Sequence, residues 1–124
     1  MSGLATRECV PCRGGVPPLK AEEIVPLLAQ LGSGWEVVEC PDSKWGTIKV
    51  LTRDYRFKDF AEALESAVVI GVMAEEQRHH PDLHVAWGQL GVEIWTHKIG
   101  GLTESDFIFA AKCDALLLKD SPAR

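Results

Sequence analysis

The sequence predicts a two-layer α+β fold, in which a four-stranded antiparallel sheet has its helices packed on one face. Three observations support this prediction. The chain has 124 residues, which is the size of one domain. Apolar residues recur at helical spacing in three segments and alternate with polar residues in four others. The alternating segments form two closely spaced pairs, which predict hairpins, so the order is helix-strand-strand-helix-strand-strand-helix.

The sequence of the first half of the chain predicts a leader, one helix and one hairpin. Residues 1–18 are rich in proline and glycine, so we expect a flexible leader followed by a single domain over residues 19–124. A helix begins near Leu19 and ends at Gly32. The hairpin has two strands and a turn, at Trp35–Cys40, Ile48–Arg56 and Pro41–Lys44 respectively.

The second half predicts a long helix, a second hairpin and a final helix. The long helix runs from Lys58 to about Gln77, and Pro81 prevents it from continuing. Its apolar stripe is wide, so either a second face meets a partner subunit or the helix is deeply buried. The strands of the second hairpin are Leu83–Trp87 and Leu90–His97. A capping-box pattern, Thr103-Glu-Ser-Asp106, begins the last helix.

Composition and charge narrow the class of protein. Hydrophobic residues make up 46% of the chain and charged residues 25%, which excludes intrinsic disorder. The net charge of −5, without any cluster of Lys and Arg, argues against nucleic-acid binding. No apolar run approaches the roughly 20 residues that span a bilayer, and the N-terminus lacks an apolar stretch of signal-peptide length. We therefore expect a cytoplasmic protein without membrane contact.

The four cysteines carry little functional signal. Cys9 and Cys12 form a C-x-x-C pair, but no second pair follows at zinc-ribbon spacing. Cys40 and Cys113 stand alone. We expect reduced thiols in the leader, and neither a structural metal site nor a redox centre.

The four histidines all lie within residues 79–97 and are the strongest candidates for chemistry. His79 and His80 follow the long helix where a strand begins, and His97 ends the neighbouring strand of the same hairpin. Because those two ends are adjacent, we expect the three imidazoles to converge at the uncovered face of the sheet. Convergent imidazoles without a nucleophile indicate proton transfer, since a neutral imidazole accepts a proton and an imidazolium donates one.

These residues also have structural interpretations. Either His79 or His80 alone could cap the helix, and Asp106 could be only a helix-capping carboxylate. His84 is expected to be an exposed strand residue. His80 and His84 are four residues apart, but the proline between them prevents a shared helical face, so we expect no zinc site.

The two tryptophans of the second hairpin are expected on opposite faces of the sheet. Strand alternation places Trp95 beside His97 on the uncovered face, where its ring could stack on a flat molecule. The same alternation places Trp87 in the core.

Four motifs together resemble the signature of the pterin-4a-carbinolamine dehydratases. They are Glu75-Glu-Gln-Arg-His79-His80-Pro81, Trp87-Gly88, Trp95-Thr96-His97 and Gly101-Leu-Thr-Glu-Ser-Asp106. Their spacing is similar to that of the family without gaps, and the resemblance extends from Leu19 to Leu118. It implies an α+β fold with a four-stranded antiparallel sheet, assembled as a homodimer or homotetramer.

The resemblance also implies a reaction, the dehydration of a 4a-hydroxytetrahydropterin to a quinonoid dihydropterin. That step recycles the cofactor of aromatic amino-acid hydroxylases. The resemblance implies that the dehydratase itself needs no metal or organic cofactor. On this basis His79, His80 and His97 are expected to be catalytic. His79 and His97 share the roles of acid and base, with the assignment open, and His80 orients the substrate. The expected substrate-binding residues are Glu75, Trp95, Thr96 and Asp106.

Two other functions stay open alongside the enzyme. Relatives that lack the reaction act as binding partners, either as a dimerisation cofactor and coactivator of a transcription factor or as an assembly factor. A pterin-binding regulator without turnover is the third possibility. The complete set of histidines favours the enzyme.

Overall fold

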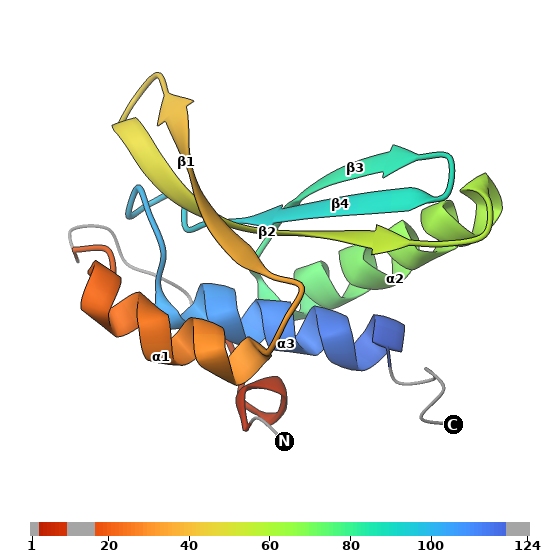
Figure 1. Ribbon diagram of the computed structural model, residues 1–124, viewed down its shortest axis with the longest axis horizontal. Coiled ribbons are helices and arrows are strands. Elements are labelled where there is room, and N and C mark those ends of the chain that lie inside the picture. The colour runs from red at the N-terminus through yellow and green to blue at the C-terminus, as the bar shows by residue number, and fades with distance from the viewer. Residues whose placement is uncertain (1–2, 10–16, 119–124) are drawn as a thin grey trace.

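Two β-hairpins form one antiparallel sheet, and the helices cover one of its faces (Figure 1). The computed structural model describes residues 3–9 and 17–118. In this part of the chain the helices are η1 (Leu4–Thr6, a 3₁₀ helix), α1 (Ala21–Leu31), α2 (Phe60–Gln77) and α3 (Glu104–Leu118). The strands are β1 (Glu36–Asp42), β2 (Gly46–Arg56), β3 (Asp82–Ala86) and β4 (Gln89–Ile94), and their order in the sheet is β1-β2-β4-β3. The predicted fold class and element order are confirmed.

The two central strands direct their apolar side chains toward the helices. Leu51 of β2 pairs with Ile94 of β4, and Tyr55 pairs with Leu90. These four side chains are at most 4% exposed, and residues two apart in a strand share a face. The fully buried residues that meet them from the helices include Ile70, Phe107 and Phe109. Burial of each such side chain contributes about 1.5–3 kcal/mol, so this core holds α2 and α3 against the sheet.

The Asp106 carboxylate makes one bond of the predicted capping box at the start of α3. The Thr103 backbone N–H donates to Oδ2 of Asp106 at 2.7 Å, and the Asp106 N–H donates to the Thr103 carbonyl at 3.0 Å. Both bonds satisfy backbone groups that the first turn of a helix leaves unpaired. The side chain of Asp106 has no exposed area, so the start of α3 also brings a carboxylate into the interior.

The described part of the leader packs on α3. Leu4 is 1% exposed, and Arg7 forms a two-pronged ion pair with Glu104, at 2.8 and 3.1 Å. Cys9 is also buried. This segment therefore lies against the domain, whereas we expected a flexible leader. Cys12, the second member of the C-x-x-C pair, lies outside the described residues.

Trp87 is not a core residue, so that prediction is wrong. Its side chain is 74% exposed, because β3 ends at Ala86 and Trp87 stands in the turn to β4. Gly88 follows with φ +70°, a left-handed conformation that glycine adopts readily in tight turns. Strand alternation does not extend into such a turn.

His97 lies beyond the strand to which we assigned it. β4 ends at Ile94, and a turn follows in which the Thr96 carbonyl accepts the Gly100 N–H at 2.9 Å. Gly100 has φ +78°, and a Cβ at this position would lie 2.3 Å from the Trp45 ring. The tip of the β1–β2 hairpin therefore packs on the turn that carries His97.

One face of α2 is buried and another is apolar but exposed. The buried face includes Ala63, Ala67, Ile70 and Ala74. The exposed stripe consists of four side chains at four-residue spacing that are 45–59% exposed: Phe60, Leu64, Val68 and Val72. The alternative of a deeply buried helix is therefore wrong. No helix within the described ranges has the length and apolarity needed to cross a membrane.

Candidate active site

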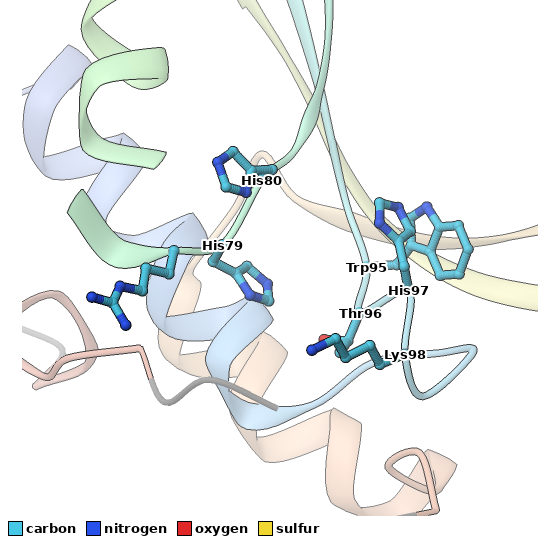
Figure 2. A pocket seen from close by; sticks show the side chains of 7 residues that line it. His79, His80, Trp95, Thr96, His97 and Lys98 are labelled. Atoms are coloured by element: carbon cyan, nitrogen blue, oxygen red, sulfur yellow. The ribbon is translucent and has the colours of Figure 1, made fainter. Parts of the chain in front are cut away.

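A cavity of about 350 Å³ opens between the C-terminal end of α2 and the turn that follows β4. Figure 2 shows His79 and His80 on one wall, and Trp95, Thr96, His97 and Lys98 on the other. Arg78 lines the cavity as well. The volume suits a small molecule. The three imidazoles that we predicted to converge all line this one cavity.

The end of α2 turns the two adjacent histidines in different directions. Arg78, the residue after the helix, has φ +55° and ψ +40°, a left-handed conformation that is uncommon except for glycine. The N–H groups of Arg78 and His79 both donate to the Ala74 carbonyl, and Pro81 keeps the helix from resuming. As a result His79 is only 8% exposed, whereas His80 faces solvent.

A buried carboxylate holds His79 in place. Nε2 of His79 lies 2.6 Å from Oδ1 of Asp106, a short hydrogen bond to a charged acceptor. Oδ2 of Asp106 accepts from the Thr96 hydroxyl at 2.8 Å and from the Thr103 backbone N–H at 2.7 Å. A carboxylate oxygen accepts and an imidazole N–H donates, so in the neutral ring this contact favours the tautomer with the proton on Nε2 and the lone pair on Nδ1. The Phe109 ring supports the imidazole, with 5.8 Å between the ring centroids.

The other two imidazoles are more exposed. Nε2 of His80 lies 2.6 Å from Oε2 of Glu75, but their side chains are 59% and 79% exposed, so solvent screens this pair. The His97 ring meets the Trp95 ring edge-on, with 4.1 Å between centroids and 84° between planes. The site therefore combines one buried imidazole, bonded to a carboxylate, with two that water can reach.

The chain matches the family described as pterin 4 alpha carbinolamine dehydratase over residues 17–116. The chain belongs to this family. A relative from Rubrobacter xylanophilus is 53% identical over 116 residues, which are 94% of this chain and 100% of the relative. A relative from Rickettsia canadensis is 47% identical over 93% of this chain and 98% of its own length. Both are named for pterin-4-alpha-carbinolamine dehydratase.

A solved structure supports the same relationship. The crystal structure of a transcriptional coactivator/pterin dehydratase from Brucella melitensis resembles this chain with a TM-score of 0.66 and 31% sequence identity. The similarity covers 80% of this chain and 97% of that one.

The residues expected in the dehydratase site are brought together. Five of them line the cavity: His79, His80, Trp95, Thr96 and His97. The other two contact the histidines. Asp106 is fully buried and contacts the lining residues His79 and Thr96, and Glu75 contacts His80. The roles of these residues in the reaction remain predictions.

Arg78 and Lys98 also line the cavity, although neither is among the site residues expected from the sequence. Arg78 stands in the motif that contains the histidine pair, and only Lys98 was not named. Each directly neighbours a site histidine in the chain, which is the signal that could have found them. His84, by contrast, is exposed on β3, as expected, with its nearest carboxylate, Glu93, at 3.7 Å. Within residues 3–9 and 17–118, no three side chains of His, Cys, Asp or Glu are grouped so that they could hold a metal ion.

Proposed function

We propose that this protein is a 4a-hydroxytetrahydropterin dehydratase that works by histidine acid–base catalysis. Family membership supports the reaction class, a hydro-lyase acting on a pterin carbinolamine. The observation that carries the proposed mechanism is the meeting of three imidazoles at one cavity, with one of them held by a buried carboxylate.

The elimination requires an acid and a base on one small molecule. In the substrate, C4a carries a hydroxyl group and N5 carries a hydrogen. The acid protonates the hydroxyl as the C4a–O bond breaks, and the base removes the N5 proton as the C4a=N5 double bond forms. The hydroxyl and the transferred proton leave as one water molecule. Well-placed acid and base groups accelerate such steps by about 10²–10⁴-fold each.

We assign the base to His79 and the acid to His97. Asp106 engages the Nε2 proton of His79, so the Nδ1 lone pair is available for the N5 proton. His97 is exposed, so water can supply the proton that it donates as the acid. Turnover leaves His79 with one extra proton and His97 with one fewer, and exchange with solvent restores both. His80 orients the substrate, and Trp95 offers an aromatic surface to the pterin ring.

A stopped-flow assay with synthetic 4a-hydroxytetrahydropterin tests this function. The wild-type protein should form the quinonoid product faster than the spontaneous reaction, and His79→Gln and His97→Gln should each lower kcat by about 10²–10⁴-fold. His84→Gln is the matched control, because His84 lies outside the cavity. A wild-type rate equal to the spontaneous rate would remove the enzyme function. Full activity in both site variants would remove the assignment of roles.

The product also suggests a place for the reaction. A quinonoid dihydropterin must be reduced before it serves again as a tetrahydropterin, so the step fits cofactor recycling beside an aromatic amino-acid hydroxylase.

The exposed stripe of α2 supports self-association. Exposed apolar patches mark interaction surfaces, so we propose that a second copy of the chain covers the stripe in a homodimer or homotetramer. Val68→Glu should therefore reduce the mass measured by sedimentation, whereas Val25→Glu, an exposed valine of α1, should not. An unchanged mass for Val68→Glu would contradict this interface. The same stripe favours the second candidate function, a non-catalytic binding protein, which the stopped-flow assay separates from the enzyme.

A further inference from the structure

Two cations line the cavity without a carboxylate partner. Arg78 and Lys98 are both exposed, and neither takes part in an ion pair or side-chain hydrogen bond within the described residues. The carboxylates that touch the site histidines are already engaged, Glu75 by His80 and Asp106 by His79. In a chain with a net charge of −5, two unpaired cations at one cavity form a local positive potential.

The backbone at Arg78 gives an independent reason to look for a ligand. Arg78 is the one non-glycine residue with positive φ in the described part of the chain, and glycine is the favoured residue after a helix in this conformation. Strained backbone positions concentrate at binding sites. Here the strained residue is a long cation that borders the cavity next to His79.

We propose that Arg78 and Lys98 bind an anionic group, a carboxylate or a phosphate, on the side chain of the pterin substrate. This inference rests on the proposed function. A pterin carries its side chain on C6, which is bonded to the reacting N5, so the side chain emerges beside the groups that handle the N5 proton. Lys98 extends from its turn toward the wall that carries His79 (Figure 2). Arg78 adjoins His79 in the chain and lines the same cavity as Lys98.

Equilibrium binding of three oxidised pterins that share one ring tests the proposal. The neutral probe is 6-hydroxymethylpterin, and the anionic probes are its phosphate monoester and pterin-6-carboxylate. Two exposed charge contacts supply about a tenfold preference for the anions, and the preference should shrink at about 0.5 M salt. The two anionic probes distinguish a phosphate site from a carboxylate site.

Variants separate the cations from general effects of charge. Arg78→Gln and Lys98→Gln should each weaken binding of the anionic probes, and the double variant should bind all three pterins alike, with the neutral probe unaffected. Lys58→Gln is the matched control. It removes the same charge at the opposite end of α2, about 27 Å away along the helix.

The outcomes distinguish failure of the anion site from failure of the proposed dehydratase function. Equal affinity of the wild-type protein for the neutral and anionic probes overturns the anion site and leaves the dehydratase intact. A preference that survives in the double variant also overturns it. Failure of every pterin to bind would overturn both the anion site and the proposed function.

Discussion

Replacing Asp106 by Asn should disable the enzyme while leaving its fold in place. The amide has nearly the size of the carboxylate, and its oxygen can still accept from Thr96 and Thr103 as Oδ2 does. Its NH₂ group, however, takes the position of Oδ1 and faces Nε2 of His79. Two donors cannot pair, so the His79 proton should move to Nδ1, the nitrogen that we assign as the base.

The size of the effect follows from this change of tautomer. A base nitrogen that is already protonated cannot accept the N5 proton, so kcat should fall by about 10²–10⁴-fold, the full contribution of one acid–base group. The same substitution in a serine-protease triad lowers kcat about 10⁴-fold through the wrong tautomer. Stability should change far less, by about 1–3 kcal/mol at most, because one hydrogen bond to a charged group is altered and no cavity forms.

Two measurements and one control make the test specific. Stopped-flow rates give kcat, and ¹⁵N NMR of the histidine ring reports which nitrogen of His79 carries the proton. Asp114→Asn is the matched control. Asp114 is also on α3 and is largely buried, but its bonds go to Trp35, Arg53 and Tyr55 rather than to the cavity. This control should lose stability and keep kcat. A folded Asp106→Asn protein with kcat within about threefold of wild type would refute the proposed role of the carboxylate.

Three further predictions follow from backbone conformation and burial. The free energy of unfolding in urea should be about 1 kcal/mol higher for Arg78→Gly than for Arg78→Ala, because φ at this position is +55°. Equal values would show that the backbone at Arg78 is not strained. Burial raises the pKa of the Cys113 thiol and of the Tyr55 phenol, so the folded protein keeps protons that the unfolded chain loses above about pH 9. The contribution of these two groups to the unfolding free energy should therefore be unchanged below that pH and fall above it, by up to about 1.4 kcal/mol per pH unit for each group, with a shallower fall in Cys113→Ala. Gly100→Ala should destabilise the protein by about 1–3 kcal/mol and lower activity, because its Cβ would meet the Trp45 ring at positive φ, and a wild-type melting temperature would disprove this.

The features that sequence reasoning predicted correctly depend on backbone geometry alone. Alternation in paired segments requires hairpins, and hairpins bring the start of β3 beside the end of β4. The convergence of His79, His80 and His97 follows from that adjacency and from Pro81, which ends the helix. The bond from the Thr103 N–H to the Asp106 carboxylate was predictable because the residue types of a capping box occupy fixed positions.

The features that it missed depend on where elements stop and how far long side chains reach. Trp87 was assigned to the core and His97 to a strand, because alternation does not show that both belong to turns. Contact between His79 and Asp106, 27 residues apart, requires α3 to dock beside the end of α2. The positions of Arg78 and Lys98 at the cavity depend on the left-handed conformation of Arg78 and on the turn after β4, and alternation predicts neither.

Asp106 links folding to chemistry in a single side chain. One of its oxygens secures the opening turn of α3, and the other holds the imidazole that we assign as the base. If that turn frays, His79 loses its carboxylate partner. Catalysis should then stop even though the sheet is still folded. A substitution at Asp106 should therefore lower both stability and activity, because the new side chain must accept from the Thr103 N–H and from His79 at once.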